Sequence, residues 1–210
     1  MLNTSSRMTE TIAICGGIGS GKSIVSRILT VLGFDVYDCD SEAKRLMDAD
    51  DAIKDAIARD IAGECIVHGT IDRPRLAGIV FSDSVKLEAL NAIVHAAVRR
   101  HLAAWIEART GHPKFIETAI LYQSGLDRMV DEVWEVTAPA DVRIARVMAR
   151  NSMSAAEVKA RIDAQDAFVP ADIHPSVRVI SNDNITPVLP QIEILLRQLC
   201  GQNNPYIFAK

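Results

Sequence analysis

The chain has 210 residues, of which 49% are hydrophobic and 24% are charged, and its formal net charge at pH 7 is −4. This composition excludes a disordered chain and is that of a protein with one substantial core. No apolar stretch approaches the roughly 20 residues of a membrane-spanning helix, and residues 1–10 lack the apolar centre of a signal peptide, so we expect a cytoplasmic protein. The acidic balance disfavours a general nucleic-acid surface, so any anion binding must be local.

The most informative segment follows the apolar run Thr11–Cys15, which we predict to be a strand. Residues 16–23 contain the pattern G-x-x-x-x-G-K-S, and a helical pattern begins near Lys22. Glycines let backbone N–H groups turn toward an anion, and the helix adds the positive end of its dipole. The segment therefore predicts a cradle for the phosphates of ATP, in which Lys22 reaches the β- and γ-phosphates and Ser23 ligates Mg²⁺. The predicted ATP-binding residues here are Gly17, Ile18, Gly19, Ser20, Gly21, Lys22, Ser23 and Ile24.

Strand-like segments alternate with helical patterns along the chain. The expected strands are Thr11–Cys15, Phe34–Asp38, Lys114–Thr118, Glu132–Thr137 and Arg178–Ser181. Such alternation predicts an α/β fold in which helices cover both faces of a five-stranded parallel sheet. A last helix begins at Thr186-Pro187, and Leu189, Ile192, Leu195, Leu196 and Leu199 form its expected core face.

A helical insertion, roughly Ser41–His112, separates the second and third strands. Within it, Asp83 is expected to cap a helix that runs to about Thr110. Asn91, His95 and Arg99 recur at a spacing of four and form a polar stripe beside the apolar positions. This pattern fits a solvated helix face or a substrate-binding surface, and the residues alone leave both open.

A second helical excursion follows the fourth strand. Pro139 suits the first turn of a helix, and a second helix starts with the capping box Ser154-x-x-Glu157. One face of the first helix carries Arg143, Arg146 and Arg150. Arginines on one face are common on ordinary surfaces, but next to a phosphate cradle they favour a lid that closes over a triphosphate.

Carboxylates and an amide end several of the predicted strands. Asp38 and Asp40 close the second strand, where a spacing of two places both on one side of an extended chain. One could accept the proton of a substrate hydroxyl while the other orients Mg²⁺-bound water; alternatively, Asp40 only caps the helix that follows. Glu117 is a candidate carboxylate near Mg²⁺ or a simple strand-end charge. The segment Asn182-Asp183-Asn184 either offers amide groups to a base or forms a plain Asx turn.

Taken together, these segments resemble the dephospho-CoA kinase family from Thr11 to about Leu199. The residues that carry the resemblance are 16–23, 38–40, 69–73, 80–82, 90–95, 98–99, 146–150, 161–165, 171–172 and 179–182. The resemblance implies transfer of the γ-phosphate of ATP, with Mg²⁺, to the ribose 3′-hydroxyl of dephospho-CoA. It also implies a P-loop kinase core (8–40, 112–142 and 171–201), a helical CoA-substrate-binding region (41–111) and a lid (143–170), which we expect to form a single compact unit.

The family pattern also implies roles for single residues. Asp40 matches the catalytic base, and Lys22 and Arg150 fall where the phosphates are bound. The ATP site would add Arg146, Arg150 and Asn182 to the P-loop residues. Substrate binding is assigned to Asp38, Asp40, Arg45, His95, Arg99, Glu117 and Arg161.

The chain departs from the usual family pattern at Cys15, Ile24, Ala96, Gln123 and Asp183-Asn184, none of which removes the cradle or Asp40. Two other functions stay open: a nucleoside monophosphate kinase-like small-molecule kinase, and a nucleotide-dependent switch. We expect dephospho-CoA and ATP as partners, and no nucleic acid, membrane or obligate protein partner.

Overall fold

The computed structural model describes residues 10–109, 111–151 and 153–200. The chain divides into two compact units, residues 1–37 with 109–210 and residues 38–108. We call them the sheet unit and the helical unit, and each is described by itself. The expectation of a single compact unit stays a prediction.

The sheet unit is built on a five-stranded parallel sheet with the order β2-β5-β1-β6-β7. The strands are β1 (Thr11–Cys15), β2 (Asp35–Asp38), β5 (Lys114–Glu117), β6 (Glu132–Thr137) and β7 (Val177–Ser181). Every residue of the central strand β1 is buried, as expected for a parallel sheet covered on both faces. The predicted bounds of β1 and β6 are confirmed, and the other three strands differ from their predicted bounds by one residue at one end.

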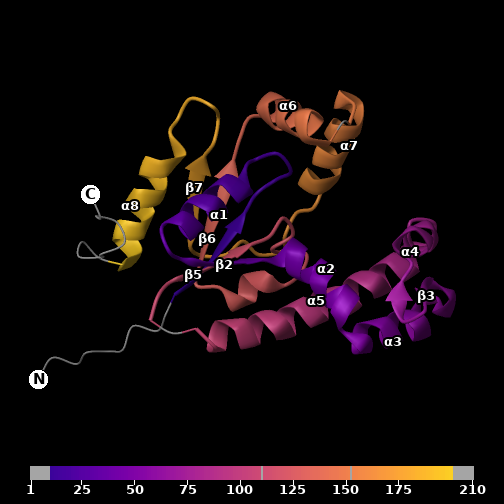
Figure 1. Ribbon diagram of the computed structural model, residues 1–210. Helices are drawn as coiled ribbons and strands as arrows, with labels where there is room; N and C mark the ends of the chain where they lie inside the picture. The colour runs from indigo at the N-terminus through magenta and orange to yellow at the C-terminus, as the bar shows by residue number, and fades with distance from the viewer. Residues whose placement is uncertain (1–9, 110, 152, 201–210) are drawn as a thin grey trace, which may run out of the picture. The chain divides into compact units, whose positions relative to one another are not determined.

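Two helices cover one face of this sheet, α1 (Lys22–Val31) and α8 (Val188–Cys200) (Figure 1). The core between them and the strands includes Val25, Leu29, Trp134, Ile192 and Leu196. Burying each large side chain contributes about 1.5–3 kcal/mol, so this layer holds the P-loop end of β1 and α1 in place. Leu189 was predicted to face the core, but it is 45% exposed, and the preceding residue Val188 packs against the core in its place.

A helical hairpin follows β6. It consists of α6 (Ala140–Asn151) and α7 (Ala155–Asp166) (Figure 1). The predicted capping box is present: Ser154 Oγ accepts from the Glu157 N–H, and the Glu157 carboxylate accepts from the Ser154 N–H. Pro139 precedes the first turn, where its carbonyl accepts from the Arg143 N–H. The hairpin closes on its own apolar cluster of Val147, Val158 and Ile162.

The helical unit contains α2 (Cys39–Ala49), α3 (Asp51–Asp60), α4 (Arg73–Val80) and α5 (Ser84–Glu107). The long helix α5 packs against the other three. Asp83 caps α5 as predicted, through hydrogen bonds from the Val85 and Lys86 N–H groups, but the helix ends at Glu107, before Thr110, which lies outside the described residues. A short antiparallel pair, β3 (Ile66–Val67) and β4 (Thr70–Ile71), interrupts the insertion that was predicted to be helical.

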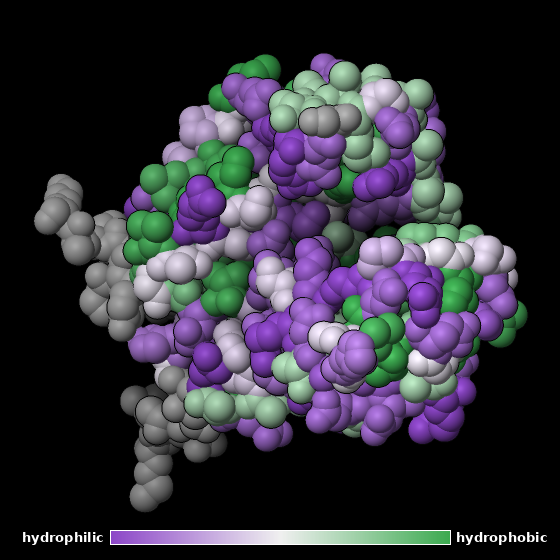
Figure 2. All heavy atoms as spheres, turned by 45° about the vertical axis from the view of Figure 1, so that its right-hand side comes forward, coloured by the Kyte–Doolittle hydropathy of each residue, from purple (hydrophilic) through white to green (hydrophobic). Residues whose placement is uncertain are grey.

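The surface of the helical unit in Figure 2 is mostly hydrophilic, with hydrophobic side chains scattered among the polar ones. Phe81 and Val85, for example, are 80% and 73% exposed. In the part of the chain that the structure describes, no helix combines the length and the apolar character that crossing a membrane requires.

Candidate functional site

The P-loop connects β1 to α1, and its backbone leaves little room for side chains. Gly19 has a φ of +79°, and a Cβ there would lie 2.6 Å from the Arg143 carbonyl oxygen. Gly21 sits at the N-cap of α1 with a φ of 97° and gives the helix no side-chain cap. Lys22 is the first residue of α1, and its Nζ donates to the Gly16 carbonyl at 2.9 Å. Glycine is therefore required here by geometry, as a phosphate cradle demands.

The start of α1 lacks a side-chain cap, because its N-cap residue is Gly21. The Ser20 hydroxyl is buried and has no hydrogen-bond partner among the described residues. An uncapped helix N-terminus beside an unpaired hydroxyl fits an anionic ligand, because the ligand can accept hydrogen bonds there.

The helical hairpin holds the P-loop through Ile18. The Ile18 N–H donates to Gln165 Oε1 at 2.7 Å, and the Ile18 carbonyl accepts from Arg143 Nε at 2.9 Å. The Ile18 side chain packs against the apolar cluster of the hairpin. Gln165 also donates to the Ala119 carbonyl, after β5, at 3.0 Å. The hairpin thus holds the phosphate loop through both backbone polar groups of one residue, Ile18.

Arg146 ties the loop to the end of β7. Its guanidinium donates to the Gly19 and Ser20 carbonyls at 3.3 and 3.2 Å, and to the Asn182 carbonyl at 2.9 Å. The Asn182 amide is buried and donates to the same Ser20 carbonyl at 2.8 Å. The Asx turn is formed instead by Asp183, whose carboxylate accepts from the N–H groups at 185 and 186, and these bonds lower its pKa to about 2.

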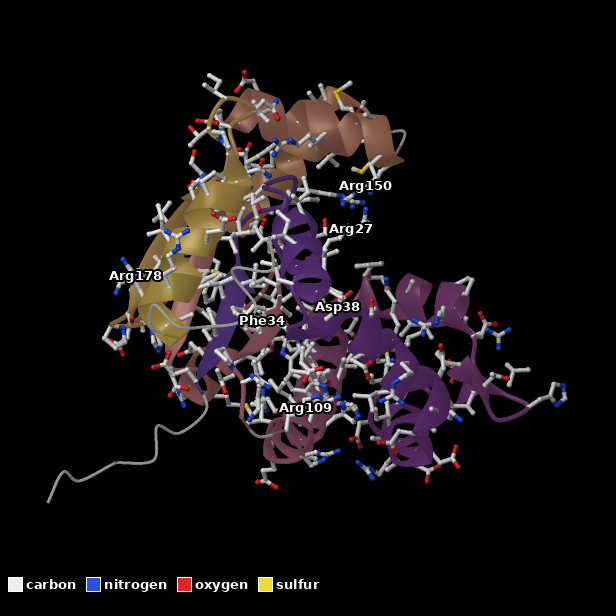
Figure 3. The ribbon with its side chains drawn as sticks, turned by 60° about the vertical axis from the view of Figure 1, so that its left-hand side comes forward. Arg27, Phe34, Asp38, Arg109, Arg150 and Arg178 are labelled. Atoms are coloured by element: carbon white, nitrogen blue, oxygen red, sulfur yellow. The ribbon has the colours of Figure 1, made fainter. Side chains whose placement is uncertain are left out.

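Arg150 and Arg161 lie on the exposed side of the hairpin. Arg150 Nε donates to the side chain of Asn151 at 2.8 Å, and Figure 3 shows the arginine below the hairpin, on the side of the labelled Arg27 of α1. Arg161 is exposed on α7. Of the three arginines predicted to share a face, Arg143 and Arg146 contact the P-loop, while Arg150 is directed to solvent.

A pocket of about 280 Å³ lies beside the start of the P-loop, where Gly16, Gly17, Tyr122 and Gln165 are among its lining residues. The Cys15 thiol also borders it, and burial, followed by nearby Glu135, raises the pKa of this thiol to about 12. Cys15 therefore stays protonated and is not a nucleophile at neutral pH. Glu117 ends β5 and pairs in register with Ile14 of β1, so it lies at the same edge of the sheet as the P-loop.

The structure corrects the prediction for the two aspartates. The strand β2 ends at Asp38, and Asp40 is the second residue of α2, so the two do not lie on one side of an extended chain. Asp38 is the helix cap, because its carboxylate accepts from the Asp40 and Ser41 N–H groups at 3.0 and 3.1 Å. The alternative in which Asp40 is only an N-cap is therefore wrong. Asp40 is exposed in the first turn of α2.

Three of the predicted substrate-binding residues, Arg45, His95 and Arg99, lie on two helices of the helical unit. On α2, Arg45 donates to the Glu42 carboxylate at 2.7 Å and lies 2.9 Å from Nε2 of His101 on α5. On α5, His95 is half-buried, and this burial, followed by neighbouring Arg99, lowers its pKa below the ordinary value. These side chains offer cationic and neutral donors that an anionic substrate could use.

Sequence reasoning did not assign Arg143, Gln165, Glu42 or His101 to the site. Arg143 was visible as a neighbour of Arg146 on a helix face, but its contact with Ile18 spans 125 residues. The contact of Gln165 with the same residue spans 147 residues. No local pattern signals such pairs, whereas the Glu42–Arg45 spacing is a common helical ion pair.

Comparisons with known proteins agree with this geometry. The model of the dephospho-CoA kinase family matches residues 10–187. The dephospho-CoA kinase of Porphyromonas gingivalis is 41% identical over 156 residues, which are 74% of this chain and 77% of that protein. The enzyme of that name from Symbiobacterium thermophilum is 36% identical over 195 residues, covering 90% of this chain and 81% of the relative.

Solved structures show the same fold. The crystal structure of TT1252 from Thermus thermophilus superimposes with a TM-score of 0.74 at 33% identity, covering 94% of this chain and 100% of that one. The dephospho-CoA kinase from Campylobacter jejuni gives a TM-score of 0.65 at 22% identity, covering 92% and 99%. With its P-loop, its helical hairpin and its helical insertion, this chain belongs to the dephospho-CoA kinase family.

Proposed function

We propose that this protein phosphorylates the ribose 3′-hydroxyl of dephospho-CoA with ATP, giving coenzyme A and ADP. Membership of the family supports this reaction. The observation that supports ATP binding is the glycine loop at the uncapped start of α1. Arginine and glutamine side chains of the hairpin hold this loop in place. The uncapped helix start and the unpaired Ser20 hydroxyl suit a phosphate chain.

In this reaction the bond between the γ-phosphorus of ATP and its bridging oxygen to ADP breaks, and a bond from that phosphorus to the ribose 3′-oxygen forms. Lys22 lies at the start of α1, where its ammonium can neutralise charge on the β- and γ-phosphates. Arg146 keeps the loop in shape through the Gly19 and Ser20 carbonyls. Arg150, exposed on the hairpin, contacts the phosphates when the lid of residues 143–170 closes.

We assign the proton of the 3′-hydroxyl to the carboxylate of Asp40, which acts as the general base. The acceptor is held by Arg45, His95, Arg99 and Arg161, with Asp38 and Glu117 as further polar contacts. Mg²⁺ would be held by the phosphates and the exposed Ser23 hydroxyl in the first turn of α1, and it would neutralise charge on the transferred group. Among the described residues, no cluster of three or more histidine, cysteine, aspartate or glutamate side chains could hold a metal ion. In this proposal the phosphates and water molecules complete the coordination of Mg²⁺.

The proposal includes the division into a nucleotide-binding core (8–40, 112–142 and 171–201), a CoA-substrate-binding region (41–111) and a lid (143–170). A cytoplasmic location, and a reaction without nucleic acid, membrane or obligate protein partner, are part of the same proposal.

A panel of acceptors with MgATP tests the reaction. Dephospho-CoA should gain the mass of one phosphoryl group while ATP is converted to ADP, and the Lys22→Ala protein is the negative control. Phosphorylation of AMP or another monophosphate, with none of dephospho-CoA, would instead identify a nucleoside monophosphate kinase. ATP hydrolysis that no acceptor changes would identify a switch.

A further inference from the structure

Arg143 reaches from the first turn of α6 into the P-loop. Its side chain is only 12% exposed, although arginine is usually a surface residue. The tip of the guanidinium lies against Gly17, where a Cβ would be 2.1 Å from Arg143 Nη2. The absence of a side chain at Gly17 is therefore what admits this arginine to the loop.

The three guanidinium nitrogens of Arg143 have different surroundings. Nε donates to the Ile18 carbonyl at 2.9 Å, and Nη1 lies 3.5 Å from the Asp166 carboxylate. Nη2 is buried and has no hydrogen-bond partner among the described residues. Leaving a buried donor unpaired is unfavourable, and more so when the donor is charged, so an acceptor from a ligand would be strongly favoured here.

The charge around Arg143 also favours an anion. Its pair with Asp166 is long, and the Asp166 side chain is 57% exposed, so the carboxylate neutralises the guanidinium only weakly. Arg146, by contrast, directs its nitrogens to backbone carbonyls at Gly19, Ser20 and Asn182. Arg143 therefore brings to the loop a charged donor that the protein itself leaves unused.

We infer that Arg143 is a further phosphate-binding residue of the ATP site. Nη2 donates to an oxygen of the phosphate chain, while Nε remains bonded to the Ile18 carbonyl. This inference rests on the proposed function and extends it, because the family pattern assigned only Arg146 and Arg150 of the hairpin arginines to ATP. If Arg143 binds the phosphate chain, its contribution to nucleotide affinity should depend on the number of phosphates in the nucleotide.

The alternative is that Arg143 only fastens the hairpin to the loop through Ile18. Calorimetric titration of the Arg143→Gln protein with AMP, MgADP and MgATP separates the two roles. We expect the affinity for MgATP and MgADP to fall about tenfold, the size of one charge-assisted hydrogen bond, and the affinity for AMP to fall less. Equal loss for all three nucleotides, or unchanged affinity for MgATP, would overturn the inference.

Two controls sharpen this experiment. Asp166→Asn removes the carboxylate partner and should leave MgATP affinity unchanged or higher, whereas a fastening role through the ion pair predicts a loss. Arg178→Gln removes an exposed arginine of β7 that pairs with Glu132, far from the hairpin in Figure 3, and should not change MgATP affinity. A loss in the Arg178→Gln protein as large as that in Arg143→Gln would show a general charge effect and overturn the inference.

Folding and nucleotide binding are checked separately. Where Arg143→Gln does not give a folded protein, Arg143→Lys carries the same comparison, with an expected loss of about threefold for MgATP because the charge stays and the planar fork is lost. A loss for Arg143→Lys that is the same for AMP would again indicate fastening. Failure of the unmodified protein to bind MgATP would overturn the proposed function itself, while normal binding by both proteins would overturn only the role of Arg143.

Discussion

The helix that follows the P-loop begins differently from the helices of the helical unit. In the helical unit, α2, α3, α4 and α5 each start with an aspartate whose carboxylate accepts from first-turn N–H groups. In the sheet unit, α1 starts at a left-handed glycine with no side-chain cap. A capped helix end has little capacity left for an anion, whereas an uncapped end in a glycine loop can bind phosphate through its backbone. Under the proposed function, we therefore expect the loop at α1 to bind the phosphates and the helical unit to recognise the acceptor through side chains.

The two regions also differ in how far apart in sequence their interacting residues lie. The P-loop is held by Arg143 and Gln165, which are 125 and 147 residues away from Ile18. In the helical unit, the contacts of Arg45 are closer in sequence: Glu42 is three residues away on the same helix, and His101 is 56 residues away on α5. Residues that share a hydrogen-bond network do not act independently, so paired changes at the loop, or at Arg45 and His101, should have non-additive effects.

The largest effect is expected at Lys22. Lys22→Ala removes the ammonium from the phosphate cradle, and loss of such an electrostatic contact typically costs about 3 kcal/mol or more of transition-state stabilisation, or at least about 10²-fold in kcat. The unfolding temperature of Lys22→Ala should change little. Lys159→Ala, which removes an exposed lysine paired with Asp163, is the matched control and should keep full activity. Near-normal turnover of Lys22→Ala would contradict the role of the P-loop in catalysis.

The next largest effect is expected at Asp40, the proposed general base in the helical unit. Asp40→Asn should lower kcat on the order of 10²-fold, because an amide cannot accept the hydroxyl proton. Its free energy of unfolding should fall by no more than about 1 kcal/mol, since Asp40 is a first-turn residue and not the cap. Steady-state kinetics and thermal melts check both numbers, and a stable Asp40→Asn enzyme with full activity would leave the reaction without its proposed base.

Changes at Arg146 and Arg150 distinguish a residue that holds the loop in shape from one that acts when the lid closes. Arg146→Gln loses charge-assisted bonds to the loop, each worth about 1.5–3 kcal/mol, so the protein should bind ATP more weakly and unfold at a lower temperature. Arg150→Gln should lower kcat alone, because this exposed side chain acts only on closure. Equal effects of the two changes on the unfolding temperature would contradict the distinction.

On the acceptor side, Arg99→Ala and His95→Gln should each weaken dephospho-CoA binding about tenfold while sparing ATP, as expected for the loss of one hydrogen bond to a charged group. Burial lowers the pKa of His95, so the free imidazole is neutral near pH 7. An anionic acceptor would raise that pKa, so binding takes up a proton and the affinity should increase from about pH 8 to about pH 6. Titrations over this range should show the increase in the unmodified protein and none in His95→Gln; a pH-independent affinity would contradict contact with an anion.

The smallest effect concerns a helix cap alone. Asp83→Ala removes the carboxylate that caps α5 and should lower the free energy of unfolding by about 1 kcal/mol, with no change in kcat. Asp83→Asn should keep most of this stability, because asparagine caps nearly as well. Denaturant unfolding of the two proteins measures the difference, and equal losses in both would show that the ionised charge, not the hydrogen bonds, stabilises the helix.

Local chemistry allowed much of the sheet unit to be predicted. The strand Thr11–Cys15, the start of α1 at Lys22 and the capping box at Ser154 were each visible, because apolar runs, glycine loops and caps act over a few residues. The two aspartates at the end of β2 show the limit of this reasoning. The sequence showed that a helix starts there, but an Asp-x-Asp spacing allows either carboxylate to cap it, and only the backbone path places Asp38 at the cap and Asp40 in the helix.

The sequence by itself determined where a phosphate chain can bind, because the glycines and the lysine of the P-loop act through neighbouring backbone groups. The strand order β2-β5-β1-β6-β7 and the contacts of Arg143 and Gln165 with Ile18 were decided only by the tertiary structure. The physical reason for the two contacts with Ile18 is packing. The hairpin closes on its own apolar cluster, and the Ile18 side chain packs against that cluster from the loop. Burial of that side chain brings the two polar residues to the loop peptide, a consequence that no local spacing encodes.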